Sequence, residues 1–204
     1  MKPKNIIFLI LVIAVIAIVF YSFQGSQDDE AYVAQIVKER KEKDHFMRTA
    51  KDSPITDKEN FKGLKYFKPD PRYKIIADLQ PITSRKAVVL TTSDGKEERY
   101  LEYAYATFNL DGRENKLIIY EIMDMGPFRG KLFLAFGDKT SAVETYGAGR
   151  YLDIMKVPGS STITLDFNKA YNPYCAYNET FSCPLPPLEN LLEVAINAGE
   201  KIYE

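Results

Sequence analysis

An uncharged apolar segment, residues 6–23, constrains the fold of this chain more than any other feature. Fourteen of its eighteen residues are Ile, Leu, Val or Phe, and the segment follows Lys2 and Lys4. As a helix it would be about 27 Å long, close to the ~30 Å hydrocarbon core of a bilayer. The two lysines favour a cytoplasmic N-terminus. We therefore expect Ile6–Phe23 to contact the lipid bilayer as a single-pass anchor in the cell membrane. The C-terminal domain would then face the periplasm or the cell exterior.

A cleaved signal peptide is the main alternative to an uncleaved anchor. Such peptides have an apolar region of about 7–15 residues and a small-x-small cleavage site. The segment here is longer, and cleavage after Gly25 would place Phe23 at the upstream small position. The sequence therefore favours an anchor that is retained.

The residues after the anchor divide into two parts, a charged helix and a larger domain. The Ser26–Asp29 tetrapeptide resembles a capping box, and it predicts a helix over Asp28–Thr49 that ends before Ser53-Pro54. The middle of this helix, Lys38–Asp44, is entirely charged, which favours a solvated stalk. We expect a cytoplasmic stub and anchor (1–23), a linker and charged helix (24–52), and a domain over 53–204.

The C-terminal domain has the apolar periodicity of β-strands, with turn residues about every ten positions. Short connections of this kind require antiparallel neighbours and are typical of a β-sandwich or a barrel-like fold. The fold class expected is therefore mainly β with an N-terminal α-helix. The predicted strands are Tyr73–Leu79, Lys86–Thr92, Arg99–Leu110, Lys116–Met123, Lys131–Phe136, Arg150–Ile154 and Thr162–Phe167.

The composition excludes several classes of function. Lys and Arg number 27 against 28 Asp and Glu, so there is no excess of basic residues that would suggest nucleic-acid binding. The only histidine, His45, lies far from the predicted strands, which argues against a Ser-His-Asp or Cys-His catalytic group. We expect no metal and no cofactor.

The two cysteines, Cys175 and Cys183, form an even pair in a domain expected outside the cytoplasm. This favours a disulfide. Two buried free thiols, a redox dithiol and a zinc site are the alternatives, although the last two lack the usual C-x-x-C spacing or four ligands.

Two polar segments set among glycines and aromatic residues, 138–151 and 166–177, are the candidates for a binding site. Each candidate residue also has a structural interpretation, such as a Glu144–Arg150 ion pair or a braced turn. Together they favour a pocket that binds a ligand. The predicted ligand-binding residues are Glu144, Arg150, Asp166, Asn168 and Tyr171.

The same segments carry a resemblance to a known family. The pattern ETYGxGRYL at 144–152, DFNxAYNPxCAY at 166–177 and CPLPPxEN at 183–190 resembles a family of uncharacterised prokaryotic proteins of about 200 residues, known only as a domain of unknown function. The resemblance extends over about residues 28–200, and the chain departs from it mildly at Ala148 and Tyr174. It implies a fold and boundaries, but no activity.

Three functions remain compatible with the sequence. The first is a membrane-anchored extracytoplasmic protein that binds a small polar or envelope-derived ligand. The second is a carboxylate-dependent hydrolase that uses Glu144 and Asp166. The third is a structural or assembly partner in the cell envelope, contacted through the charged helix.

Overall fold

The computed structural model describes residues 27–123 and 131–203. The predicted anchor at 6–23 lies outside these residues. Within the described ranges, no helix combines the length and the apolar character needed to cross a bilayer.

All seven predicted strands are present, and their bounds lie within a few residues of those expected. One short 3-10 turn, η1 (Pro71–Tyr73), precedes the first strand, and three more follow the last: η2 (Phe167–Lys169), η3 (Tyr174–Ala176) and η4 (Leu188–Asn190). The strands are β1 (Lys74–Pro81), β2 (Ala87–Thr91), β3 (Glu97–Leu110), β4 (Arg113–Ile122), β5 (Lys131–Phe136), β6 (Arg150–Met155) and β7 (Thr162–Asp166).

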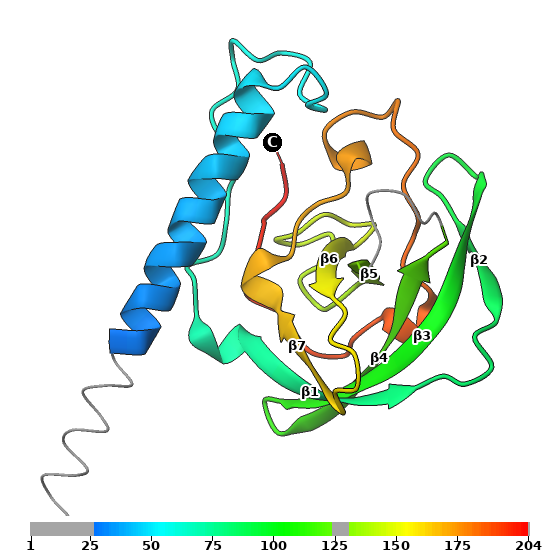
Figure 1. Cartoon of the computed structure of the whole chain (residues 1–204). Helices are drawn as coiled ribbons and strands as arrows, with labels where there is room; N and C mark the ends of the chain where they lie inside the picture. The colour runs from blue at the N-terminus through cyan, green and yellow to red at the C-terminus, as the bar shows by residue number, and fades with distance from the viewer. Residues whose placement is uncertain (1–26, 124–130, 204) are drawn as a thin grey trace, which may run out of the picture.

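The strands form one antiparallel sheet that curls into a half-barrel (Figure 1). Its order is β6-β5-β4-β3-β1-β7, with β2 paired to β3. The predicted sandwich is therefore wrong, because all seven strands belong to a single sheet, and the barrel-like alternative is closer. Beyond β7, Tyr171 pairs with Tyr151 of β6 through two backbone hydrogen bonds of 2.8 and 3.0 Å, which brings the two ends of the sheet together.

A β-bulge in β3 determines which side chains face which side of the sheet. The register with β4 shifts between Glu102 and Ala104. A one-residue shift reverses the alternation of a strand. Tyr100, before the bulge, and Phe108, after it, therefore belong to different buried clusters although both numbers are even.

The two clusters lie on opposite sides of the strands. We call the first the tail core, because it includes the C-terminal segment; it contains Ala106, Phe108, Leu117, Ile119, Leu134, Phe136, Leu165, Phe167, Leu192, Val194, Ile196 and Ala198 among others. We call the second the tyrosine core; it contains Leu90, Tyr100, Ile118, Tyr120, Phe133, Ala135, Tyr151, Cys175 and Cys183.

Asn190 fills a gap between two strands that diverge. The β4–β5 ladder contains only two residue pairs. The fully buried Asn190 side chain accepts a hydrogen bond from Ile118 N (2.7 Å) and donates to Ile118 O and Ala135 O (2.9 and 2.8 Å). It therefore satisfies backbone groups that a continuous ladder would otherwise pair.

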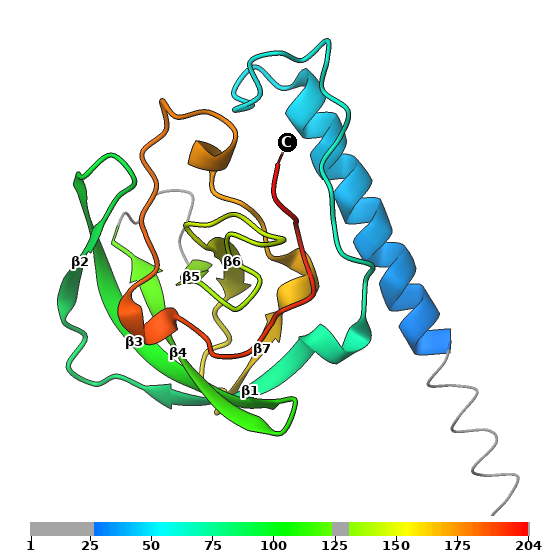
Figure 2. The same cartoon turned by 180° about the vertical axis from the view of Figure 1, so that it is seen from behind.

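The N-terminal helix spans residues 27–49 and lies along one side of the half-barrel (Figures 1 and 2). Ile36 and Met47 are buried on the face that packs against the domain. Arg40 and Lys43 lie on the same face, at helical spacing from Ile36, and both bond to the domain. The charged middle of the helix is thus partly docked, whereas the sequence predicted a solvated stalk.

Candidate functional site

Arg150, a predicted ligand-binding residue, is almost completely buried and holds the C-terminal segment. Its guanidinium donates to the backbone carbonyls of Ile196, Ala198 and Glu200. It also pairs with Asp138 at 2.9 Å, and both side chains are only 1% exposed. Asp138 in turn accepts a hydrogen bond from Ile196 N. The structure thus places Arg150 in a buried clamp on the chain's last residues.

Asp166 and Asn168 form the turn that follows β7. Asp166 accepts hydrogen bonds from Asn168 N and, at 2.6 Å, from the Tyr32 hydroxyl of the helix. Burial, together with this bond, raises the pKa of Tyr32. The Asn168 side chain pairs with Asp70, accepting from its N–H at 2.9 Å and donating to its carbonyl at 2.8 Å. Both residues therefore join segments distant in the sequence.

Glu144 lies on an exposed turn, where it pairs with Lys201 at 3.0 Å. Tyr171 lies elsewhere, with its hydroxyl donating to Asp153 at 2.8 Å. None of the cavities described here is lined by more than two of the five predicted residues. Glu144 and Asp166, the hydrolase pair, have separate partners and no common cavity among these.

The predicted disulfide is absent from the structure, which is a correction to the sequence analysis. Cys175 and Cys183 are both buried free thiols. Each sulfur is accommodated by a hydrogen bond of its own: Cys183 Sγ accepts from Cys175 N at 3.1 Å, and Cys175 Sγ accepts from the Tyr146 hydroxyl at 3.9 Å. The second alternative from the sequence, two buried thiols, is the one observed.

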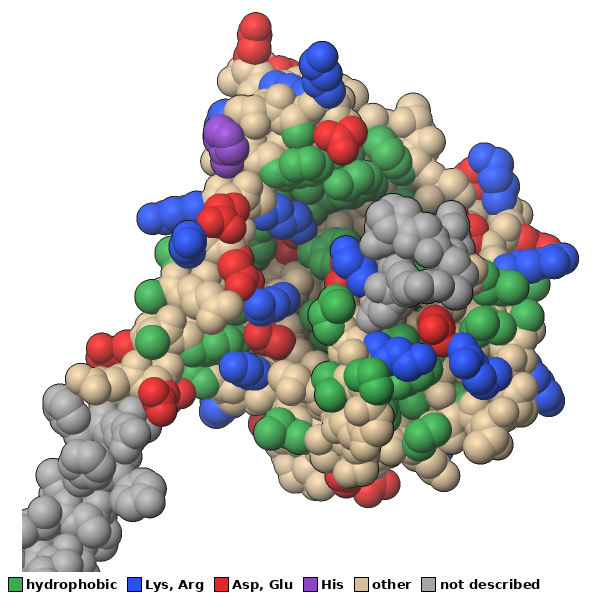
Figure 3. All heavy atoms as spheres, viewed as in Figure 1, with side chains coloured by type: hydrophobic (Ala, Val, Ile, Leu, Met, Phe, Trp, Pro, Cys, Tyr) green, Lys and Arg blue, Asp and Glu red, His purple; other side chains and the backbone are tan. Residues whose placement is uncertain are grey.

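The candidate site is a cavity of about 590 Å³ between the helix, β6 and the segment that contains the cysteines. The surface in Figure 3 is hollowed beside the helix, and hydrophobic side chains gather around the hollow. We call this cavity the aromatic pocket. It is lined by Lys43, Phe46, Glu98, Tyr151, Asp153, Lys169, Tyr171, Pro173, Tyr174, Phe181, Ser182, Cys183 and Pro184.

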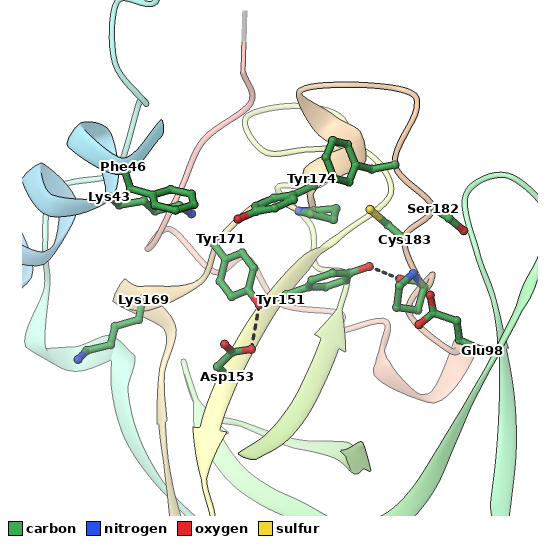
Figure 4. Close-up of a pocket in the computed structure, with 13 residues that line it drawn as sticks. Lys43, Phe46, Glu98, Tyr151, Asp153, Lys169, Tyr171, Tyr174, Ser182 and Cys183 are labelled. Carbon is green, nitrogen blue, oxygen red and sulfur yellow. Dashed lines mark hydrogen bonds between the residues drawn. The ribbon is translucent and has the colours of Figure 1, made fainter. Parts of the chain in front are cut away.

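Aromatic rings from separate segments form the walls of the pocket (Figure 4). The backbone bridge between β6 and the end of the sheet places Tyr151 and Tyr171 beside each other, with ring centroids 5.9 Å apart in an edge-to-face arrangement. Tyr174 packs edge-to-face on Phe181 at 5.3 Å. Phe46 reaches the pocket from the helix. Rings arranged in this way present both faces and edges to a bound molecule.

The lysines of the pocket already have carboxylate partners. Lys43 pairs with Glu200 at 2.8 Å and lies 4.8 Å from the centroid of the Tyr171 ring. Lys169 pairs with Glu39 of the helix at 2.9 Å, and its side chain points away from the other labelled residues in Figure 4. The positive charges at the pocket are therefore neutralised within the protein.

Among the residues that the structure describes, the carboxylates of the pocket are held only by tyrosine hydroxyls. Glu98 accepts from Tyr100 and Asp153 accepts from Tyr171, each at 2.8 Å. Burial, reinforced by the neighbouring carboxylate, raises the pKa of both tyrosines. The hydroxyls therefore stay protonated and remain donors. Across the described part of the chain, neither carboxylate has a lysine or arginine within ion-pair distance.

The nucleophiles at the pocket are not activated. Burial is the main cause that raises the pKa of the Cys183 thiol to about 12, so that the thiol is neutral at physiological pH. Ser182 donates its hydroxyl hydrogen to Asp94. His45 is exposed on the helix. Over residues 27–123 and 131–203, no group of three or more His, Cys, Asp or Glu side chains is placed to hold a metal ion.

Of the five predicted ligand-binding residues only Tyr171 lines the pocket, although the candidate segments 138–151 and 166–177 also contain Tyr151, Lys169, Pro173 and Tyr174. Lys43 and Phe46 were missed because they belong to the helix interpreted as a stalk. Glu98 was missed because a single acid just before the predicted strand Arg99–Leu110 carries no signal of its own. The alternation in β6 was the available signal for Asp153, since it places Asp153 on the same side as Tyr151.

The fold and the pocket together define a half-barrel β domain with an aromatic cavity against its N-terminal helix. The chain belongs to the family described as protein of unknown function (DUF1684), which matches residues 59–201. It is similar to the solution NMR structure of an uncharacterised protein from Haloarcula marismortui, with 40% identity and a TM-score of 0.66. The match covers 86% of this chain and 96% of that one. No curated protein matches the chain.

Proposed function

We propose that this protein binds a small amphiphilic organic molecule in the aromatic pocket. The observation that carries the proposal is a cavity of about 590 Å³ lined by five aromatic rings and a few polar groups. Ligand sites are usually concave, mostly apolar and about 300–1,000 Å³ in volume, with a small number of polar groups that orient the ligand. The pocket has these properties.

Binding explains the site better than hydrolysis does. A hydrolase needs an activated nucleophile or a general acid and base that face the same substrate. Cys183 is held neutral, Ser182 bonds to Asp94, and Glu144 and Asp166 have no shared cavity among those described. The pocket thus offers recognition groups without an evident reaction centre.

We also propose that the domain acts at the outer face of a membrane. This proposal is supported by the sequence, because the uncharged segment 6–23 is long enough to span a bilayer and follows two lysines. A reporter enzyme fused to the C-terminus, active only outside the cytoplasm, tests it. Activity only inside the cell, or a mature chain that begins near Gln27 by mass spectrometry, would contradict it.

The pocket itself can be tested with the full-length chain in lipid nanodiscs, labelled with 3-fluorotyrosine. On addition of indole, a neutral aromatic probe, we expect the ¹⁹F signals of Tyr171 and Tyr174 to shift. The signal of Tyr105 should not shift, since this half-buried tyrosine does not line the pocket. Signals are assigned from single tyrosine-to-phenylalanine variants.

The variant Tyr174→Ala should abolish most of this response. Tyr174 is half-buried, and its ring packs on Phe181, so its removal opens the pocket with limited effect on the fold. The matched control is Tyr105→Ala, which should bind indole as the natural chain does. Equal responses from both variants, in chains with unchanged circular dichroism, would refute the pocket.

A further inference from the structure

Carboxylates outnumber ammonium groups around the aromatic pocket, even when each lysine is counted together with its carboxylate partner. The lining contains Lys43 and Lys169, whose partners are Glu200 and Glu39. The lining also contains Glu98 and Asp153. Among the described residues, four carboxylates therefore accompany two ammonium groups at the site, and the excess negative charge resides on Glu98 and Asp153.

The unpaired carboxylates lie on either side of the Tyr151 ring (Figure 4). The two tyrosine hydroxyls that bond to them orient the carboxylates without neutralising them. Each carboxylate oxygen has more than one lone pair, so capacity for a further donor remains. A positively charged group between these carboxylates would gain Coulombic attraction, more from Glu98, which is half-buried, than from Asp153, which is exposed to water.

The aromatic walls favour the same kind of group. Cations are attracted to the faces of tyrosine and phenylalanine rings, and more strongly where the site is shielded from water. The pocket already shows this contact internally, because Lys43 Nζ lies 4.8 Å from the centroid of Tyr171. Tyr151, Tyr174 and Phe46 provide further rings without a cation over them among the described contacts.

We propose that the molecule bound in the aromatic pocket is an organic cation, with an amine or quaternary ammonium group on an apolar body. The ammonium group lies among the rings near Glu98 and Asp153, and the apolar body contacts the remaining walls. This inference rests on the proposed function, because it assigns a ligand class to the same pocket.

Three probes of nearly identical shape test the charge preference. They are choline, its neutral carbon isostere 3,3-dimethylbutan-1-ol, and the anion 3,3-dimethylbutanoate. Their dissociation constants are measured with the full-length chain in nanodiscs, from the ¹⁹F signals described above. We expect choline to bind about fivefold or more tightly than the alcohol, and the anion to bind most weakly.

Two conservative substitutions locate the charge that matters. Glu98→Gln and Asp153→Asn each keep an oxygen that can accept the tyrosine hydrogen bond, so the wall geometry is retained. Each should weaken choline binding about threefold to tenfold and leave the neutral alcohol within about twofold. Glu97→Gln is the matched control, because Glu97 is exposed, lies next to Glu98 in β3 and does not line the pocket.

The outcomes separate this inference from the function on which it rests. If the neutral alcohol or the anion binds as well as choline and the Gln and Asn variants change nothing, the pocket binds ligands but the cation class is wrong. If no probe, including indole, perturbs the pocket tyrosines, both proposals fail. A loss of choline binding in Glu97→Gln equal to that in Glu98→Gln would also overturn the inference.

Discussion

The two sides of the curled sheet bury their residues in different ways. The tail core is mainly aliphatic and closed, and the charged groups beside it, Asp138 and Arg150, are 1% exposed and bond to each other and to backbone groups. The tyrosine core packs rings against β3, β4, β5 and β6, and it opens into the aromatic pocket. One sheet thus supports a sealed face and an accessible face.

This contrast predicts which changes in the chain affect stability and which affect binding. Polar groups in the tail core have no access to water, so the loss of one partner leaves the other uncompensated. Tyrosines on the other side combine a packing ring with a hydroxyl that remains near solvent or ligand. The following predictions test this contrast, beginning with the largest effect.

Removal of the buried Arg150 guanidinium should cause the largest decrease in stability. Arg150→Ala leaves Asp138 without its ion pair and three C-terminal carbonyls without a donor. We expect the free energy of unfolding to fall by about 3–5 kcal/mol, measured by urea denaturation. The control, Arg99→Ala on an exposed position of β3, should change it by less than about 0.5 kcal/mol. A similarly small change for Arg150→Ala would show that the clamp does not stabilise the fold.

Loss of the Asn190 side chain, which fills the gap between β4 and β5, should cause the next largest decrease in the free energy of unfolding. Asn190→Ala deprives Ile118 N, Ile118 O and Ala135 O of their side-chain partner. The expected loss is about 3 kcal/mol in the same measurement, because buried backbone groups would be left unpaired. Asn109→Ala is the control, since Asn109 is exposed. Equal stabilities for the two variants would contradict the role assigned to Asn190.

Stability should fall in alkaline solution, partly because of a thiol in the tyrosine core. Burial raises the pKa of Cys183 from 9.0 to about 12 in the folded chain. Between these values the unfolded chain binds fewer protons, so the free energy of unfolding decreases as pH rises, by at most about 1.4 kcal/mol per pH unit for one group. Below pH 9 this thiol has no effect. Cys183→Ala should therefore show a shallower decline between pH 9 and 11, and an unchanged slope would refute the assignment.

Loss of the Tyr151 hydroxyl, which belongs to the tyrosine core, should have the smallest effect on stability. Tyr151 donates to Pro184 O, and Tyr151→Phe removes only that bond. We expect a loss of about 1 kcal/mol, compared with no more than a few tenths for Tyr105→Phe, whose hydroxyl has no described partner. A loss as large as that of Arg150→Ala would remove the distinction between the two sides of the sheet.

The secondary structure could be predicted from the sequence because local patterns determine it. Alternation and turn residues located all seven strands, and a capping box located the helix 27–49. The closure of the sheet into a half-barrel could not be predicted, since it depends on a bulge at Glu102–Ala104 and on one bridge between Tyr151 and Tyr171. Neither feature has a distinctive local pattern.

The site was predicted less well for a related physical reason. Arg150 and Asn168 were singled out as polar residues among glycines and aromatics. In the structure, each donates hydrogen bonds to backbone carbonyls of residues far away in the sequence. The sequence around a residue does not predict hydrogen-bond partners that are distant along the chain. Glu98 and Lys43 belong to the pocket only because the sheet curls toward the helix. Tyr171 was found because it lies in the polar segment 166–177, which in the structure also closes the sheet through its bridge to Tyr151.

The clamp on the C-terminal segment has a consequence for biosynthesis. The carbonyls that Arg150 binds belong to Ile196, Ala198 and Glu200, which lie 46 to 50 positions after it in the chain. During synthesis the guanidinium and Asp138 therefore leave the ribosome before these carbonyls do. The charge pair stays without its backbone acceptors until residue 200 has emerged, so the interior of this domain can close only after that point.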